Sequence, residues 1–221
     1  MTNPGLPIDA ALVAERLAAV HERIRAAGGT GVTVLPVTKT FPLAAVEAAL
    51  TAGCTAVGEN YAQEVVAKFA GNEGRIPVHF IGQLQTNKVR LLVPYVTVFE
   101  TVDRPSLLDE IARRAPGAHI LVQVAAAAEP GKGGCAPEAV PALVEQASSA
   151  GLVVDGLMTV GPTDGGPEAA RAGFREVRRL CTELGLAVCS MGMSDDLEVA
   201  VQEGSTQVRI GSALFGARPA R

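Results

Sequence analysis

Lys39 is the first residue in the sequence whose position could support chemistry. It ends the stretch VTVLPVTK, residues 32–39, in which the other side chains are mostly apolar or β-branched. A lysine at the end of such a strand is partly desolvated, which favours the neutral amine, and a neutral amine attacks an aldehyde to form a Schiff base. The position equally suits a lysine whose ammonium group simply reaches water. Lys39 alone therefore leaves both interpretations open.

Two segments near the end of the sequence could bind an anion. Ser194 directly precedes a short predicted helix, so its hydroxyl group would lie beside the free N–H groups of the first turn. Gly211 and Ser212 end the stretch QVRIGS, where a glycine lets backbone N–H groups approach an anion closely. Helix capping and a tight turn explain the same residues, and Asp195 and Asp196 argue against an anion unless both point to solvent.

Arg209 adds a cation to this group. It lies in an apolar run two residues before Gly211, and therefore on the same face of a strand. A buried arginine needs a polar partner. That partner is either a carboxylate such as Glu59 or an acceptor on a ligand, for instance a ring nitrogen.

These residues need a scaffold that brings them together, and the chain alternates short β-rich runs with helical patterns. The runs cover residues 32–39, 56–59, 78–82, 97–102, 119–126, 153–160, 187–192 and 207–212. Most are continuously apolar, which is typical of parallel strands buried on both faces. Segments such as 42–53 and 167–185 between them have helical punctuation or spacing.

Eight such runs predict a single α/β domain over residues 1–221, a TIM-type (β/α)8 barrel. An open, doubly wound sheet has the same local pattern. The strand count and the lack of GxGxxG after the first run favour the barrel. The chain ends too soon after the last run for a closing helix, so we expect an extra N-terminal helix within residues 8–29 to cover that gap.

Active sites of such barrels lie at the carboxyl ends of the strands. The polar or sulfur-bearing residues predicted there are Lys39, Glu59, Asn60, His79, Gln83, Met158, Thr159, Ser190, Ser194, Arg209 and Ser212. We interpret His79 as a core residue with a satisfied hydrogen bond. Lys132, in the Gly/Pro-rich stretch AEPGKGG, we expect to be solvated.

Composition excludes several classes of protein. The net charge of −4 gives no reason to expect nucleic acid as a partner, and no apolar run approaches the roughly 18 residues of a membrane span. The start of the sequence lacks the features of a secretory signal. The four cysteines have neither CxxC nor metal-ligand spacing, so we expect reduced thiols, no metal and a cytoplasmic location.

An amine, an anion cradle and an arginine in one barrel resemble the alanine racemase superfamily, and in particular its single-domain branch, the pyridoxal phosphate homeostasis proteins. The resemblance covers about residues 32–217. It rests on the motifs VTKT, VGENYAQE, HFIGQLQTNK, GLMTV and SMGMSDDLEVAVQEGSTQVRIGSALFG, which occur in the order found in that family.

The resemblance implies pyridoxal 5'-phosphate (PLP) as cofactor, with Lys39 as its Schiff-base lysine. It implies that Ser194, Gly211 and Ser212 hold the phosphate and that Arg209 faces the pyridine nitrogen. Asn60, Met158 and Ser190 would line the pocket, and no metal ligand is expected. Ser212 stands where threonine is more usual in the family, and GKGGC departs from the family pattern around Lys132.

The resemblance leaves three functions to compare. A carrier or buffer of PLP, acting in intracellular PLP homeostasis as a monomer with PLP-dependent apo-enzymes as partners, fits best. A PLP-dependent amino-acid racemase needs acid/base groups on both faces of the substrate, and neither Tyr61 nor Tyr95 is placed by the sequence over the second face. A class I aldolase would use Lys39 without any cofactor.

Overall fold

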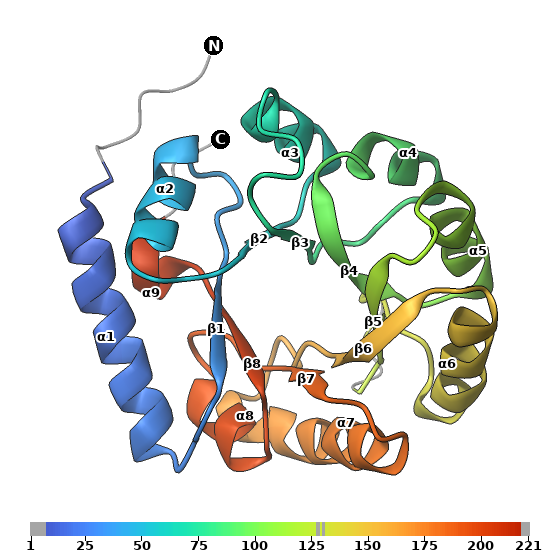
Figure 1. Cartoon of the computed structure of the whole chain (residues 1–221). Helices are drawn as coiled ribbons and strands as arrows, with labels where there is room; N and C mark the ends of the chain where they lie inside the picture. The colour runs from blue at the N-terminus through green and yellow to red at the C-terminus, as the bar shows by residue number, and fades with distance from the viewer. Residues whose placement is uncertain (1–7, 127–128, 130, 218–221) are drawn as a thin grey trace.

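Eight parallel strands in the described part of the chain form one sheet that curls into a barrel, with helices on its outside (Figure 1). The computed structural model describes residues 8–126, 129 and 131–217. The strands are β1 (Thr33–Pro36), β2 (Val57–Glu59), β3 (Val78–Phe80), β4 (Val96–Val102), β5 (His119–Gln123), β6 (Val153–Met158), β7 (Val188–Ser190) and β8 (Gln207–Ile210).

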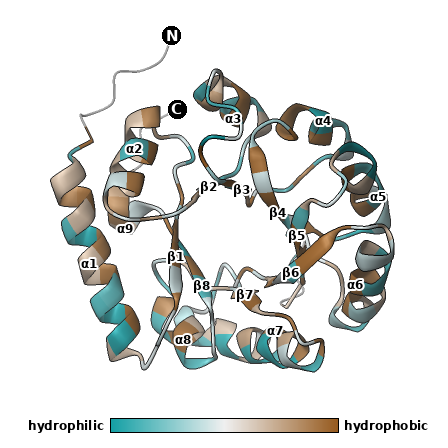
Figure 2. Cartoon of the chain, viewed as in Figure 1, coloured by the Kyte–Doolittle hydropathy of each residue, from teal (hydrophilic) through white to brown (hydrophobic). Residues whose placement is uncertain are grey.

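The helices alternate with these strands along the chain. The α-helices are α1 (Ala10–Ala26), α2 (Leu43–Thr51), α3 (Ala62–Phe69), α4 (Val89–Leu92), α5 (Pro105–Arg114), α6 (Val140–Ser149), α7 (Arg171–Glu183), α8 (Leu197–Gln202) and α9 (Ser212–Phe215). Short 3₁₀ turns are η1 (Thr86–Lys88), η2 (Pro137–Ala139) and η3 (Pro167–Ala170). Figure 2 shows both hydrophilic and hydrophobic residues on α1, α5 and α7, as expected for helices that cover a buried sheet.

The strand order distinguishes the barrel from an open sheet. Neighbouring strands follow the order β1-β8-β7-β6-β5-β4-β3-β2, so the first and last strands of the chain are paired. The remaining gap is closed by a parallel bridge between Val37 and Gly58, where the Thr38 N–H donates to the Gly58 carbonyl over 3.0 Å. The prediction of a (β/α)8 barrel is therefore confirmed.

The N-terminal helix α1 lies on the outside of the barrel, as predicted (Figure 1). Asp9 caps it by accepting a hydrogen bond from the Ala11 N–H over 2.9 Å. Its buried face carries Val13, Leu17, Val20 and Ile24, and it packs against α2, α8 and α9. The expectation that the chain is too short for a helix after the last strand is wrong, because α9 forms directly after β8.

Most of the strands are shorter than the predicted runs, and most of the difference is at their carboxyl ends. The run 32–39, for example, is a strand only over Thr33–Pro36. The polar residues that follow each strand leave the sheet at this rim and form loops. All strands are parallel, so the residues after β1, β2, β6, β7 and β8 gather at the same end of the barrel.

Among the described residues, no helix is long and apolar enough to cross a membrane. The same residues contain no group of three or more His, Cys, Asp or Glu side chains that could hold a metal ion. All four cysteines are free thiols, as predicted.

Candidate functional site

Lys39 lies in a tight turn at the carboxyl end of β1. Its side chain is half-buried, and the Phe41 N–H closes the turn by donating to the Thr38 carbonyl over 3.1 Å. The next residue, Thr40, has a φ of 68°, which is unfavourable for a β-branched side chain. Strained backbone of this kind persists only where the surroundings enforce it, and it is frequent at functional sites.

A buried lysine on α3 supports this turn from below. Lys68 Nζ donates to the Thr38 carbonyl over 2.7 Å. It also donates to Glu59 Oε1 over 2.6 Å and to Glu64 Oε1 over 2.8 Å. Glu64 in turn accepts a hydrogen bond from the Thr40 N–H over 2.6 Å. The backbone on both sides of Lys39 is therefore fixed by one ammonium group and its carboxylates.

The charges in this support are almost fully removed from water. The side chain of Lys68 is 6% exposed and that of Glu59 is 0% exposed. Burial raises the pKa of Glu59, although the charge of Lys68 and a hydrogen bond from the Thr38 hydroxyl oppose the rise. From the sequence, Glu59 was expected as a strand-end carboxylate and a possible partner of Arg209, and Lys68 had no predicted role.

Arg209 lies in β8, the strand paired with β1, in register with Leu35. It is 4% exposed. Its Nη1 donates to the carbonyl and the hydroxyl of Ser190, both over 2.8 Å, and its Nη2 donates to the Thr159 carbonyl over 2.7 Å. These bonds use three of the five N–H groups of a guanidinium and leave two for an acceptor on a ligand.

The electrostatics of Arg209 depend on burial and on the acidic groups around it. Burial lowers the pKa of Arg209, while the charges of Glu100 and Asp196 oppose the decrease. An arginine nevertheless stays protonated in proteins. Glu59, the alternative partner considered from the sequence, is bound by Lys68 instead.

The two predicted anion-binding segments follow β7 and β8. Ser194 lies in a turn, and Gly211 is the N-cap of α9, so Ser212 is its first residue. The prediction that Ser194 directly precedes the helix is wrong, because α8 begins at Leu197. The intervening residue Asp196 is buried and accepts a hydrogen bond from the Met193 N–H over 2.5 Å.

The hydrogen bond of the Asp196 carboxylate affects the prediction that an anion binds here. Asp195 is exposed, but Asp196 does not point freely to solvent, so the condition set from the sequence is met by only one of the two aspartates. The Ser194 carbonyl accepts a hydrogen bond from Arg23 of α1 over 2.8 Å. The loop is thus fixed by a carboxylate on its own chain segment and by the N-terminal helix.

The remaining predicted pocket residues also follow strand ends. Met158 and Ser190 are the last residues of β6 and β7 and are buried, and Asn60 follows β2 and is half-buried. Three buried polar atoms of the described residues have no hydrogen-bond partner: Thr40 Oγ1, Glu59 Oε2 and Asn60 Oδ1. Buried polar groups normally have partners, so these atoms, close in sequence to Lys39 or part of the predicted set, fit a site that receives a polar ligand.

A cavity of about 640 Å³ opens beside this site, over the loops that follow β2 to β5. Its lining includes Asn60, Tyr61, Gln83, Arg104 and Lys132. Of the predicted cofactor-binding residues, Asn60 alone is among the described residues that line it. We therefore place the candidate site where Lys39 and Arg209 are held, and regard the cavity as its neighbour.

Two residues outside the predicted cofactor set have clear contacts. His79 Nδ1 is 2.6 Å from Glu100 Oε1, so His79 has the polar partner that was expected, but 18% of its side chain is exposed and it is not fully within the core. Lys132 is not simply solvated, because its Nζ donates to the Gly161 carbonyl over 2.7 Å and to Glu129 Oε2 over 2.5 Å.

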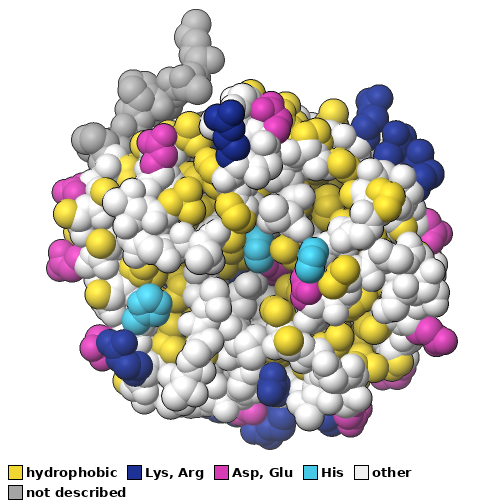
Figure 3. Space-filling model, in the orientation of Figure 1, with side chains coloured by type: hydrophobic (Ala, Val, Ile, Leu, Met, Phe, Trp, Pro, Cys, Tyr) yellow, Lys and Arg dark blue, Asp and Glu magenta, His cyan; other side chains and the backbone are white. Residues whose placement is uncertain are grey.

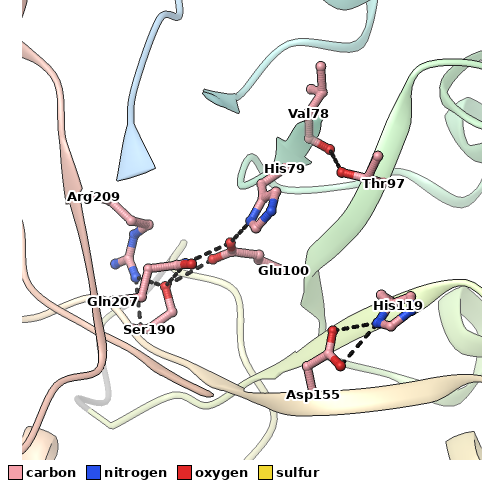
Figure 4. Close-up of polar contacts among 9 residues, drawn as sticks. All are labelled: Val78, His79, Thr97, Glu100, His119, Asp155, Ser190, Gln207 and Arg209. Carbon is pink, nitrogen blue, oxygen red and sulfur yellow. Dashed lines mark hydrogen bonds and ion pairs between the residues drawn. The ribbon is translucent and has the colours of Figure 1, made fainter. Parts of the chain in front are cut away.

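Glu100 is the functional candidate that sequence reasoning missed. It is a fully buried carboxylate in β4 and accepts hydrogen bonds from Ser190 Oγ over 2.9 Å and Gln207 Nε2 over 2.8 Å (Figure 4). The available signal was a glutamate inside the apolar run TVFETV, since an ionised group in a buried strand requires polar partners.

The chain is similar to known proteins over nearly its whole length. A family model described as alanine racemase, N-terminal domain, matches residues 8–219. The pyridoxal phosphate homeostasis protein of Pseudomonas aeruginosa is 42% identical, with 93% of this chain and 96% of that protein covered. The protein of the same name from Aquifex aeolicus is 40% identical, with 92% and 97% covered.

Solved structures agree with these relatives. The structure of PipY from Synechococcus elongatus with PLP bound superposes with a TM-score of 0.80 at 32% identity, covering 92% of this chain and 100% of that one.

Proposed function

The chain belongs to the alanine racemase N-terminal domain family and, within it, to the pyridoxal phosphate homeostasis proteins, and from this we propose that it binds PLP as a Schiff base on Lys39. We propose further that it acts in intracellular PLP homeostasis, as a carrier or buffer with little or no turnover of amino acids. Its partners would be PLP and PLP-dependent apo-enzymes, and it would act in the cytoplasm as a monomer.

The observation that carries this proposal is the pairing of Lys39 with a strained, supported turn. The Lys68 ammonium group and Glu64 fix the backbone at Thr38 and Thr40, so the amine of Lys39 is attached to a rigid base. A rigid attachment lowers the entropy cost of forming one particular covalent linkage. The bound cofactor would supply an aldehyde for the amine and a conjugated ring that withdraws electrons.

The residues at the other strand ends fit the rest of such a ligand. Ser194, Gly211 and Ser212 would hold its phosphate, and Asn60 and Met158 would line the pocket together with Ser190. The two N–H groups of Arg209 left by its protein contacts suit a ring nitrogen that accepts a hydrogen bond.

Arg209 also favours carriage over catalysis. A carboxylate beside the ring nitrogen keeps that nitrogen protonated and makes the ring a strong electron sink. Arginine only donates and stays charged, so the nitrogen stays unprotonated and negative charge on a substrate carbon is poorly stabilised. Of the two tyrosines, Tyr95 precedes β4 at the opposite end of the barrel, and Tyr61 is 41% exposed beside the cavity.

The absorbance spectrum of the purified protein mixed with PLP tests the proposal. We expect a visible band that borohydride reduction fixes to Lys39, located by peptide mass spectrometry, and that Lys39→Ala removes. Lys132→Ala is the matched control, because Lys132 lies at the same end of the barrel but bonds Gly161 and Glu129, and it should keep the band.

Other outcomes would point elsewhere. A protein that stays colourless with PLP contradicts the proposal, and trapping of a sugar-like carbonyl without cofactor would favour an aldolase. Deuterium exchange at the Cα of alanine or another amino acid in heavy water would instead establish a racemase.

A further inference from the structure

A chain of hydrogen bonds runs through the barrel interior and ends at Arg209 (Figure 4). Arg209 Nη1 donates to Ser190 Oγ over 2.8 Å, and Ser190 Oγ donates to Glu100 Oε2 over 2.9 Å. On the far side, His79 Nδ1 lies 2.6 Å from Glu100 Oε1. Glu100 is therefore the centre to which the chain leads from both directions.

This chain of hydrogen bonds runs along the barrel axis, from near the amino ends of the strands toward their carboxyl ends. His79 is level, through β4, with His119, the first residue of β5. Gln207 begins β8 and is paired with Ser190, and Arg209 follows two residues later, nearer the carboxyl end. The contacts thus lead from the amino end of the strands up to the layer in which Arg209 meets the strand-end loops.

The end of this hydrogen-bond chain at His79 is within reach of solvent. The side chain of His79 is 18% exposed, whereas that of Glu100 is 0% exposed. Figure 3 shows histidine side chains near the centre of one face of the molecule, over the end of the barrel seen in Figure 1. Glu100 is consequently buried between a partly solvated imidazole and a buried guanidinium.

Glu100 carries a negative charge in this setting. Burial alone would raise the pKa of Glu100, but the hydrogen bond and charge of His79 together with the charge of Arg209 outweigh it and lower the pKa. Arg209 keeps its proton. One negative and one positive charge therefore face each other inside the barrel, with the Ser190 hydroxyl between them.

The Ser190 hydroxyl donates to Glu100 and accepts from Arg209 and Gln207. A hydroxyl has a single hydrogen, and that of Ser190 is given to Glu100. Its oxygen is then left to accept from Arg209 Nη1 over 2.8 Å and from Gln207 Nε2 over 3.0 Å. Without an acceptor at Glu100, the Ser190 hydrogen could turn toward Arg209 and the guanidinium would lose one of its three acceptors.

We propose that Glu100 is the positioning residue of Arg209 and holds its guanidinium in place through Ser190. The negative charge of Glu100 also partly cancels the effect of the positive charge of Arg209 on the ring nitrogen of the ligand. His79 and Gln207 fix the second oxygen of Glu100 from the amino end. The part that concerns the ring nitrogen rests on the proposed binding of PLP, whereas the part that concerns the orientation of Arg209 does not.

The charge half of the proposal is tested by titrating the visible absorbance of the PLP-loaded protein with pH. In Glu100→Gln the negative charge is lost, so the protonated form of the chromophore is less stable and the midpoint should fall by about one pH unit. The other titratable or charged side chains acting on the pair, His79, Asp196 and Cys189, are unchanged in this variant.

A matched control is available at the same end of the barrel. Asp155 accepts a hydrogen bond from His119 Nδ1 over 2.8 Å and makes no contact with the Glu100 chain among the described hydrogen bonds. Asp155→Asn also removes one carboxylate paired with a histidine, and it should leave the midpoint unchanged. An equal shift in both variants would overturn the proposal.

Double-variant cycles test whether Glu100 acts through the named residues. The shift caused by Glu100→Gln should be largely lost when Ser190→Ala is already present, because the link is then cut. It should likewise shrink in an Arg209→Lys background. Full additivity in both backgrounds would mean that Glu100 is only a distant charge, and the positioning role would be wrong.

The orientation half is measured on the protein without PLP. In nitrogen-15 NMR spectra, the side-chain N–H signals of Arg209, identified by their loss in Arg209→Lys, should exchange slowly with water. Glu100→Leu, which removes the acceptor of the Ser190 hydrogen, and, as a second variant, Ser190→Ala should speed that exchange at least tenfold, while Asp155→Asn should not. Unchanged exchange in the folded variants overturns the inference; lack of a visible band in the wild type would overturn only the proposed function.

Discussion

The ammonium group of Lys68 lies 2.6 Å from Glu59 Oε1, and both side chains are buried beneath the turn that carries Lys39. The same ammonium group binds the Thr38 carbonyl, so a structural ion pair is directly joined to the backbone of the candidate Schiff-base residue.

Replacing Lys68 by Met should destabilise the protein by about 3–5 kcal/mol, because Glu59 is left as an unpaired buried carboxylate. Urea unfolding at neutral pH measures the loss. The double variant Lys68→Met, Glu59→Leu should recover much of it, since an apolar pair needs no compensation. Both variants should form the PLP linkage more slowly than the wild type, because the turn around Lys39 has lost its support. A double variant no more stable than Lys68→Met would contradict this reading.

Arg23 of α1 should matter for ligand affinity more than for stability. It donates to the Ser194 carbonyl over 2.8 Å and to Glu198 over 2.7 Å, and it is partly exposed. Exposed ion pairs contribute little to stability. Arg23→Ala should therefore change the free energy of unfolding by less than about 1 kcal/mol but weaken PLP binding several-fold.

The control for Arg23 lies on the same helix. Arg25 pairs with Glu22 on the exposed side of α1, so Arg25→Ala should leave PLP affinity unchanged in an equilibrium titration. If both variants bind PLP as the wild type does, the loop at Ser194 does not depend on α1.

Glu100 should contribute to the loss of stability in acid. Its pKa is lowered in the folded protein, so the unfolded chain binds a proton at higher pH than the folded chain does. The stabilisation is present above the ordinary carboxyl value of 4.5 and is lost as the pH falls below it. Denaturant unfolding at successive pH values between about 3 and 6 should show a shallower pH dependence in Glu100→Gln than in the wild type. A variant with the same slope would rule out this contribution.

Cys54 and Cys135 should react slowly with alkylating reagents. Burial raises the pKa of each thiol to about 11, compared with an ordinary value of 9.0. The thiolate is the reactive form, so at pH 7 each reacts about 100-fold more slowly than an unperturbed thiol. Iodoacetamide labelling followed by peptide mass spectrometry gives both rates. The urea-unfolded chain is the control, and equal rates in the two states would contradict the prediction.

The alternation of β-rich runs and helical patterns in the sequence was sufficient to predict the barrel. Continuous apolar runs identify strands covered on both faces, and their number leaves few ways to close the sheet. The ends of the elements were less predictable. Ser194 was placed beside a helix that begins only at Leu197, because the Asp196 side chain binds the Met193 N–H upstream instead of extending the helix.

Individual contacts of polar residues depended on pairing across the barrel. The sequence offered Glu59 as a partner for Arg209, but Lys68 on the following helix reaches Glu59 first, being nine residues away in the chain. The solvation expected for Lys132 failed for a similar reason, since a carbonyl 29 residues away accepts its hydrogen bond. Such contacts depend on which loops become neighbours in the folded protein, and local sequence patterns do not determine this.

The sequence by itself determined the fold class, the extra N-terminal helix and the strand ends at which Lys39, Asn60, Ser190 and Arg209 are found, because periodicity and chain order are local properties. Only the tertiary structure decided what holds these residues. Glu100 and Ser190 are 90 positions apart in the chain. They meet because the register of eight strands and the closure of the barrel direct both side chains into the same interior layer, where a buried charge must find its partners.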